Sequence, residues 1–555
     1  PASRFSELQS HIFVSDQWRA RPNLTLSMGL SYENDGQPMN QLIEKIGERE
    51  SDPARALFDA RLSPGAGNLR KVGRDNNNIA PSVGFAYTPR FKILGRNLLG
   101  YEKTVIRGGA IISYDQTPYR PLADVAASAP NVLLAAITDR TAVPRFPHVP
   151  DANEMRSLLG RDPRRFARAE LARGFRTPRS ASWHLDAIRD FDRKLTLEMT
   201  YAGSRGAGLI RAIDGNPFPA DSVSPTGQIR VYESSGHSIY HSFQARANLP
   251  VNERITGGVA YTFSKLIDDL PDSGAAIAGG IGGPASLIIP ALQSFAQNPL
   301  NSSRGERALS SLDRRHSFSA HFVWDLPSRR GQQGITGRLL GGWKASGIIE
   351  AASGSPFTPL QLLGDQSAAL FASIFSDRLG ALRPFAGNTA APADVVAFSN
   401  AANSLFHFFL NEDGSPFVSP TGFIIADRSG FRAGDTRDAR FIYNDQAVEA
   451  AARSQGLAPD AFGKTFAAGR RYGDVGRNTL IGPLLSNIDF ALLKTTKLSE
   501  KVSLQFRSEF FNLLTHPSRA IPSNILENAG GYGFADPGEA DAAPRRIRIA
   551  LKLIF

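Results

Sequence analysis

The final stretch, residues 545–555, alternates between two kinds of side chain and constrains the fold more than any other part of the chain. One parity holds Ile547, Ile549, Leu551, Leu553 and Phe555, and the other holds Arg546, Arg548, Ala550, Lys552 and Ile554. Because a strand points successive side chains to opposite faces, this stretch has one apolar face and one largely basic face. Such a strand is a hazardous edge in water, but it suits a closed barrel with lipid outside and water inside. We therefore predict an all-β fold, an antiparallel transmembrane β-barrel.

The same alternation recurs along the chain. Predicted strands cover 6–18, 24–33, 82–88, 104–115, 180–189, 195–204, 238–249, 255–266, 315–326, 342–352, 487–497, 502–513 and 545–555. These are roughly thirteen strands of about ten residues, the length that tilted strands need to cross a membrane.

The connections between these strands alternate in length. Short ones fall at 19–23, 90–102, 190–194, 250–254, 327–341 and 498–501, and long ones at 34–77, 116–177, 205–237, 268–313, 353–485 and 514–544. Membrane barrels have short periplasmic turns and long outer loops, so we expect the long loops outside and Phe555 on the periplasmic side. The largest is the 353–485 insert. Short helices are predicted at 41–58, 152–159, 163–172 and 446–453.

Composition excludes several classes of protein. The chain lacks cysteine, so it has no disulfide framework and no thiolate site. No apolar run approaches the roughly 20 residues of a membrane helix. The net charge of +11 is spread along the chain rather than gathered in a basic block. We attribute that charge to solvated loops and a wet lumen, and we expect no nucleic-acid partner.

The strand count points to a larger unit. A count of thirteen is odd, whereas single-chain bacterial barrels usually have an even number of strands. An open sheet would leave unpaired backbone groups in lipid, at a prohibitive cost. We therefore expect these 555 residues to be the C-terminal portion of a larger membrane protein.

Several motifs carry a family resemblance. They are Gly476–Pro483 (GRNTLIGP), Ser486–Phe490 (SNIDF), Val502–Pro517 (VSLQFRSEFFNLLTHP) and the closing Ile549–Phe555, with weaker matches at 13–18, 24–30 and 78–85. Together they resemble the C-terminal barrel of Oar-like TonB-dependent outer-membrane receptors, which carry a carboxypeptidase-regulatory-like N-terminal domain. The resemblance spans nearly the whole chain and is weakest in the loops.

The resemblance implies a barrel of about 22 strands, a size at which the lumen holds a plug. It implies an N-terminal plug and a box that engages the energy-transducing TonB complex; neither is recognisable in this sequence. It also implies that Phe555 is the aromatic signal read by the barrel-assembly machinery. The partners would be TonB, outer-membrane lipid, that machinery and a solute of unknown identity.

Charged residues on the inward parity are the candidate site. They are Glu198, Arg507, Glu509, Arg546, Arg548 and Lys552. One interpretation is a ladder of lumenal charges that holds a plug or guides an anionic solute. The other is that wet lumen walls are polar whatever they transport.

Other motifs carry no chemistry that we can assign. His237 and His241 would lie about 13 Å apart on a strand, too far for one metal ion. Asp268, Asp269 and Asp272 lack EF-hand spacing and are expected in a solvated loop rather than at calcium. Gly279–Gly283 is no P-loop, and no G-x-S-x-G elbow occurs. We expect no catalytic, cofactor-binding or metal residues.

The four tryptophans offer a positional test. Trp18, Trp183, Trp324 and Trp343 each fall near the end of a predicted strand, where amphipathic aromatics favour the membrane interface. Packing in a protein core is the alternative.

The leading hypothesis is a receptor in the outer membrane of a Gram-negative-type bacterium that takes up, or exports, a bulky solute. One alternative is an adhesion or matrix-interaction barrel that displays the 353–485 insert, and another is a passive porin. A plug and a TonB box in the full-length gene would favour transport. Loops carry the choice of substrate, so the sequence does not identify the solute.

Overall fold

Strands dominate the computed structural model, and most of them belong to one large sheet. The described part of the chain comprises residues 8–36, 38–58, 71–73, 75–90, 102–115, 119–131, 168–191, 195–214, 229–252, 254–270, 305–327, 332, 334–361, 383–443, 464–465, 471–473, 475–499, 502–514, 526 and 545–555. Within these ranges, no helix combines the length and the apolar character needed to span a bilayer.

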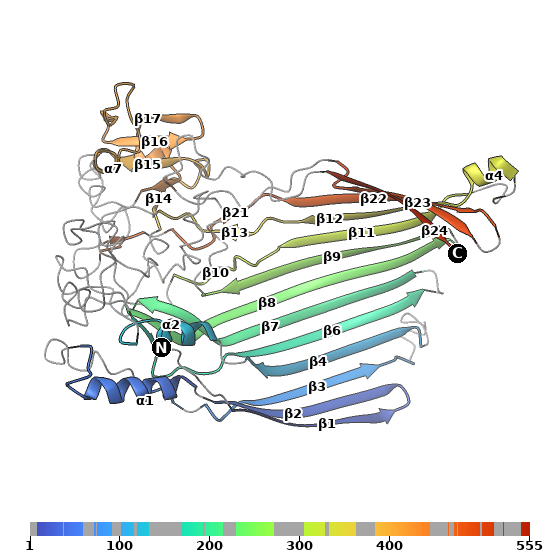
Figure 1. Cartoon of the computed structure of the whole chain (residues 1–555), viewed down its shortest axis with the longest axis horizontal. Helices are drawn as coiled ribbons and strands as arrows, with labels where there is room; N and C mark the ends of the chain where they lie inside the picture. Colours follow the sequence, from blue (N-terminus) through green and yellow to red (C-terminus); the bar gives the residue numbers. More distant parts are fainter. Residues whose placement is uncertain are drawn as a thin grey trace.

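Thirteen strands follow one another in a single antiparallel sheet, in which neighbours in the chain are neighbours in space (Figure 1). In order they are β1 (Gln9–Arg21), β2 (Leu24–Asp35), β3 (Ile79–Tyr87), β4 (Thr104–Tyr114), β6 (Arg179–Phe191), β7 (Leu195–Asp214), β8 (Ile229–Asn252), β9 (Ile255–Asp268), β11 (His316–Asp325), β12 (Trp343–Ala352), β22 (Leu485–Lys497), β23 (Ser503–Phe511) and β24 (Arg546–Ile554). We call this sheet the wall. Each of the thirteen predicted segments overlaps one of its strands, so the predicted antiparallel architecture is confirmed.

Two wall strands run well past their predicted ends. β7 continues to Asp214 and β8 begins at Ile229, and the extra residues pair with each other as far as Asp214 and Arg230. The register shifts on either side of Leu209, next to Gly208, which has a positive φ of 67°. A bulge of this kind reverses which parity faces which side, so an unbroken alternation ends there although the strand continues.

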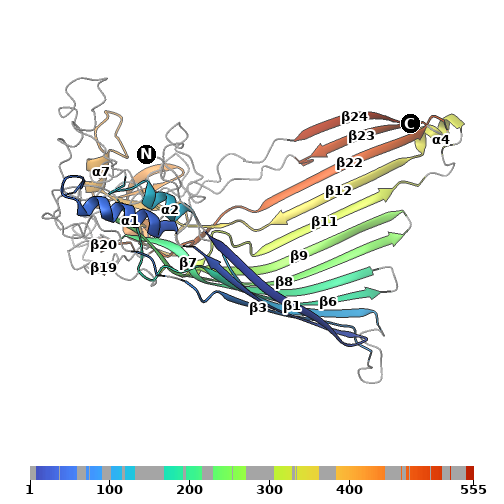
Figure 2. The ribbon, with the colours of Figure 1, turned by 60° about the horizontal axis from the view of Figure 1, so that its bottom comes forward.

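The wall is curved, and its two ends differ (Figures 1 and 2). The short connections and the C-terminus lie at one end, together with α4 (Gly334–Leu340), while the helices α1 and α2 and the insert lie at the other. Among the described residues, β1 pairs only with β2, and β24 pairs only with β23. The alternation of connection lengths thus sorts the loops to opposite ends of the wall, as predicted.

The apolar face of the wall is exposed along its length. Val83, Phe243, Val259, Phe263 and Ile549 are between 42% and 68% exposed. Neighbouring strands bring side chains of this kind together: Phe243 lies opposite Tyr201 on one side and Phe263 on the other. A continuous exposed apolar surface of this size is what lipid would cover.

The four tryptophans lie near the ends of wall strands, as predicted, and their place at a membrane interface stays a prediction. Trp18, Trp324 and Trp343 lie at the end with the short turns and Trp183 at the loop end, and none of them is buried. Trp183 covers Gly203 on the neighbouring strand, where a Cβ would collide with its ring. Core packing, the alternative interpretation, is wrong for all four.

A small apolar cluster covers the extended ends of β7 and β8. It joins α1 (Pro38–Ser51), α2 (Tyr119–Ala126) and β5 (Arg168–Leu171), which pairs in parallel with β8. The buried side chains are Met39, Leu42, Ile43, Ile46, Val72, Val125, Ala169, Phe175, Ala212 and Tyr232. These contacts attach the loop segments to the wall.

Of the predicted helices, one is confirmed, one is wrong and two lie outside the described residues. α1 confirms a helix in the 41–58 region, although it begins and ends earlier than predicted. The helix predicted at 163–172 is wrong over its described part, because Arg168–Leu171 pairs as strand β5 instead. α2 was missed. The predicted helices at 152–159 and 446–453 lie outside the described residues.

The 353–485 insert contains a second sheet with its own core. This insert sheet orders as β14 (Phe385–Ala386), β18 (Phe441–Ile442), β15 (Val396–Ser399), β16 (Phe423–Asp427) and β17 (Gly430–Gly434), beside α7 (Asn400–Phe406) and the 3₁₀ turn η5 (Thr436–Asp438). Two-residue pairs complete the described strands: β13 (Pro356–Phe357) with β21 (Leu480–Ile481), β19 (Lys464–Thr465) with β20 (Arg471–Tyr472), and β10 (Ala308–Leu309) with the end of β9.

Candidate functional site: the polar face of the wall

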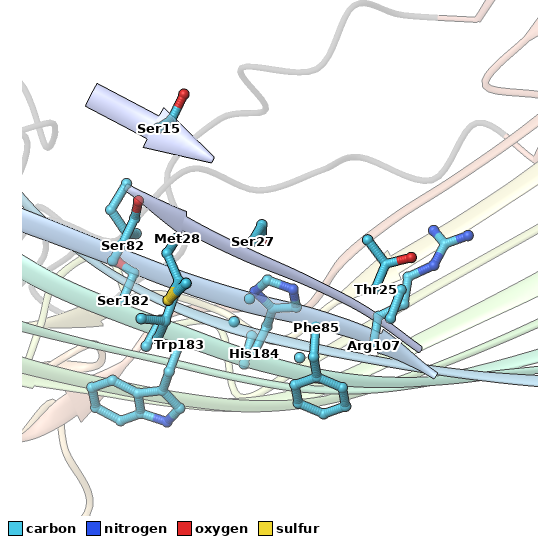
Figure 3. Close-up of a pocket in the computed structure, with 18 of the residues that line it drawn as sticks. Ser15, Thr25, Ser27, Met28, Ser82, Phe85, Arg107, Ser182, Trp183 and His184 are labelled. Atoms are coloured by element: carbon cyan, nitrogen blue, oxygen red, sulfur yellow. The ribbon is translucent and has the colours of Figure 1, made fainter. Parts of the chain in front are cut away.

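The second face of the wall is built from small and polar side chains. One row runs across eight strands in register, through Gln17, Ser27, Gly84, Gly109, His184, Ala202, Ser242 and Ser264. Figure 3 shows Ser82 and Ser182 on the side of the sheet toward β1, with the rings of Phe85 and Trp183 on the opposite side. The alternation therefore separates a polar face from an apolar face, as expected of a barrel strand.

This polar face borders a hollow of about 1070 Å³ beside β1 and the strands that follow it. Polar side chains such as Ser15, Thr25, Arg107 and His184 line it together with apolar ones such as Met28 (Figure 3). Serine and glycine are small, so these residues leave the space beside the sheet unfilled. A surface of hydroxyl groups, imidazole and guanidinium offers donors and acceptors to a polar solute or to a protein segment.

The candidate charges near the C-terminus form one cluster on this face. Arg507 and Arg548 both contact the carboxylate of Glu509, through Arg507 Nη2 and, at 3.9 Å, Arg548 Nη1. Glu509 lies directly opposite Arg548 in the register and is only 12% exposed at its side chain. The structure thus brings three of the predicted site residues together, with two cations around one anion.

The other predicted charges lie on the same face but apart from that cluster. Arg546 is paired in register with Phe511 and Lys552 with Gln505, and both cations are exposed. Glu198 lies on β7, well away from β24 along the sheet, and its carboxylate is 3.8 Å from Arg246 Nη1 on β8. Phe555 ends the chain at 92% exposure.

Three further contacts between basic and acidic side chains belong to this face and were not predicted; the two that involve histidine are ion pairs only when its ring is protonated. They are Lys344 with Asp325 at 3.2 Å, His184 with Asp186 at 3.7 Å, and His11 with Glu33 at 3.8 Å. Their shared parity with the serines was a signal available in the sequence. Within the described residues, no three potential metal ligands gather at one point.

A buried polar junction fastens the insert to the loop end of the wall. Its centre is Arg477, in the motif of the family resemblance, with a side chain only 1% exposed. Arg477 Nε donates to the carbonyl of Glu306 at 3.1 Å, while Nη2 donates to the carbonyl of Asp268 at 2.8 Å and also to its carboxylate. Arg383 donates to the carboxylate of Glu306, and both of those side chains are buried.

The next residue of the motif extends this junction. Asn478 Nδ2 donates to the carbonyl of Leu309 at 2.7 Å. Thr358 Oγ1 donates to Asn478 Oδ1 at 3.0 Å and accepts from the Asn478 backbone N–H at 2.9 Å. The motif thus acts as a structural clasp across three segments of the chain, a role that its local sequence does not reveal.

The acidic stretch after β9 corrects an expectation. Asp268 and Asp269 are 8% and 9% exposed, so the predicted solvated loop is wrong for both. Asp268 is held by Arg477, and the carboxylate of Asp269 accepts from the His237 backbone N–H at 2.5 Å. Asp272 lies outside the described residues, as does Gly279–Gly283.

His241, considered above as a possible metal ligand, contacts the Tyr201 hydroxyl through its Nδ1 at 2.8 Å.

Several solved structures are similar to this chain in fold. The outer membrane transporter YddB from Escherichia coli has 9% identity and a TM-score of 0.42, with 99% of this chain and 45% of that chain covered. A mutant of the ferric enterobactin receptor PfeA from Pseudomonas aeruginosa has 11% identity and a TM-score of 0.38, with 99% and 45% covered. The FrpB iron transporter from Neisseria meningitidis has 8% identity and a TM-score of 0.38, with 100% and 46% covered. This chain therefore spans about half the length of these proteins.

Sequence comparison gives a firmer assignment. No curated protein matches the chain. A family described as "Outer membrane beta barrel domain" matches residues 1–548, nearly the whole sequence. That match agrees with the thirteen-stranded antiparallel wall and its exposed apolar face. The chain belongs to the outer-membrane β-barrel domain family and is an outer-membrane protein.

Proposed function

We propose that this chain supplies much of the wall of a TonB-dependent outer-membrane receptor that transports a bulky solute through a plugged barrel. The observation that carries the proposal is the polar face, which is continuous across the wall and lined by small residues and charge pairs. A barrel that only anchors loops can be narrow and filled by its own side chains, whereas the small residues of this face leave a hollow beside it.

The size of the wall supports a bulky solute. Barrel diameter grows with strand number: barrels of eight strands are filled by their own side chains, whereas those of about 22 strands hold a plug. The wall already has thirteen strands and is still open between β1 and β24 in the described residues. A completed barrel would be wide enough to need a plug to prevent leakage.

The charge pairs support a role in holding that plug or guiding the solute. Glu509 with its two arginines, and Glu198 with Arg246, present both signs to the lumen at separate places. The Glu198–Arg246 pair, with side chains 35% and 61% exposed, can exchange partners with a plug segment or an anionic solute at little cost because it stays hydrated. In the mechanism, outer loops capture the solute and TonB then rearranges the plug.

The test uses the full-length gene product. It is reconstituted in liposomes, and two quantities are measured: the uptake of maltohexaose and the binding of the purified periplasmic domain of TonB. A receptor binds that domain and admits no sugar unless the plug is deleted. Free passage of maltohexaose through the intact protein, with no TonB binding, would identify a porin and overturn the proposal.

Display of the insert is a second candidate, and one observation favours it. The insert sheet buries Phe398, Ile424 and Ile425 completely, so it is a folded unit rather than a simple connection. Deleting residues 383–443 from the full-length protein separates the two functions. Loss of cell adhesion with TonB binding retained would support display.

A further inference from the structure

The outward face of the wall carries a line of basic side chains near its loop end. This basic stripe consists of Arg179 on β6, Arg205 on β7, His241 on β8, Lys265 on β9 and Arg315, just before β11. The register makes its members neighbours: His241 lies directly opposite Lys265, and the residue opposite His241 on β7 is Gly203, two places from Arg205. Arg205 in turn pairs with Ala181, two places from Arg179. The stripe crosses four adjacent strands and reaches the edge of a fifth.

A row of aromatic side chains lies on the membrane side of this stripe. It comprises Trp183, Tyr201, Phe243, Tyr261 and Phe263. The two rows touch: the Tyr201 hydroxyl contacts His241 Nδ1 at 2.8 Å, and the Arg315 guanidinium lies 6.0 Å from the centroid of the Phe263 ring. Aromatic girdles of barrels sit at the level of the lipid headgroups. The basic stripe is therefore at headgroup depth, facing the membrane rather than the lumen.

The charges of the stripe are largely uncompensated within the described part of the chain. Arg179, Arg205 and Lys265 are exposed there and form no ion pair. Arg315 is balanced in part by Asp313 at 3.5 Å. After Lys265, the next acidic residue on the same side of the strand is Asp269, which is four residues or about 13 Å farther along. Its carboxylate is already engaged by His237.

We propose that the basic stripe binds the phosphate groups of an outer-leaflet membrane lipid. Cations just beyond an aromatic girdle face lipid headgroups, and basic patches at this depth bind anionic ones. Acyl chains of the same lipid would lie along the apolar face below, where Phe243 and Val259 are exposed. The stripe thus gives this sector of the wall a preferred lipid and fixes its depth in the membrane.

The test is lipid binding by the full-length protein in neutral detergent, followed by native mass spectrometry with bisphosphorylated lipid A as the probe. We expect the Arg205→Gln/Lys265→Gln variant to bind lipid A roughly tenfold more weakly than the wild type, because neither glutamine carries the charge that attracts a phosphate group. Arg205→Lys/Lys265→Arg keeps both charges and should bind nearly as the wild type does. This charge-conserving pair shows whether the loss of affinity is electrostatic rather than a folding defect.

The matched control is Lys45→Gln/Arg173→Gln, which removes two exposed cations from the loop end outside the stripe. Lipid A affinity should not change in this variant. Equal weakening in the control and stripe variants, or no weakening in either, would overturn the proposal. Displacement of lipid A by millimolar inorganic phosphate would also overturn it, because it would identify a general anion site that ignores the acyl chains.

Discussion

The wall and the insert sheet use similar residues in opposite ways. In the wall, Phe243 and Val259 are 46% and 42% exposed, whereas in the insert sheet Phe398 and Ile425 are fully buried. Both faces of the central insert strands are packed: Phe398 and Ile424 belong to one apolar cluster, and Ile425 belongs to another. Neither face of the wall is packed in this way, because one is apolar and exposed and the other borders an open hollow.

This difference shows where each region obtains its stability. The insert sheet removes apolar surface from water by contact with its own chain, as water-soluble domains do. The wall leaves that surface for lipid to cover and satisfies its backbone by pairing between strands. Substitutions of one chemical kind should therefore have different effects in the two regions.

Truncating a buried aromatic side chain should give the largest difference. Phe398 contacts Phe408, Phe409 and Tyr443, so Phe398→Ala leaves a cavity and should destabilise the insert sheet by about 3–5 kcal/mol. Phe243→Ala in the wall loses only the transfer of a ring from water, about 1.5–3 kcal/mol, since lipid chains fill the space. Amide hydrogen exchange of 396–399 and 423–427 reports the insert, and the heat-modifiable shift in gel mobility reports the wall. Equal losses at the two sites would refute the distinction.

Breaking the buried junction at Arg477 should reduce the stability of the loop end nearly as much as Phe398→Ala reduces that of the insert sheet. Arg477→Met leaves the buried carboxylate of Asp268 without its cation, at a cost of about 3–5 kcal/mol in the stability of the loop end. Adding Asp268→Asn should recover part of that loss, because the uncompensated charge is then gone. For both variants, the rate of limited proteolysis measures the stability of the insert. The heat-modifiable mobility shift of the wall serves as the control and should not change. A double variant no more stable than Arg477→Met would count against the charge explanation.

Adding a charge tests the two faces of a single strand. Val259→Arg places a cation on the apolar face near the middle of β9 and should cost about 2–4 kcal/mol. Thr262→Arg, three residues along, places it on the polar face opposite Gln244 and Ser317 and should be nearly neutral. Urea unfolding in lipid vesicles compares the two. If both variants were equally destabilised, the apolar face would not be the lipid-facing one.

Acid should have the smallest effect, and only on the insert. Hydrogen bonds from the Arg437 side chain and backbone N–H, together with the charge of Arg437, hold the pKa of Asp435 below its ordinary value of 3.8. A carboxylate with a lowered pKa stabilises the fold above pH 3.8, and this contribution is lost as the pH falls through its folded pKa. The protection of amides around η5, measured against their intrinsic exchange rate at each pH, should therefore fall in that acid range and stay constant above it. Asp435→Asn should flatten the acid response, and an unchanged response in that variant would exclude Asp435 as its source.

The sequence determined the wall because side-chain parity is a local property of the strand. A strand between lipid and water needs one apolar and one polar face, so thirteen segments could be read from alternation and two loop classes from length. The candidate charges Arg507, Glu509 and Arg548 followed from the same parity, and the register then joined them in one cluster. Alternation failed where a bulge shifted it beside Leu209, and where both faces were buried, as in β16.

Only the tertiary structure decided which distant segments meet. Arg477 reaches Asp268 across 209 residues, and β5 pairs in parallel with β8, neither of which leaves a periodic signal in the chain. The same holds for Arg179, Arg205, His241 and Lys265 of the basic stripe, which come from four strands and become neighbours only through register. Local sequence fixes which way each side chain points, but the partner it meets depends on the alignment of strands, which the whole sheet sets together.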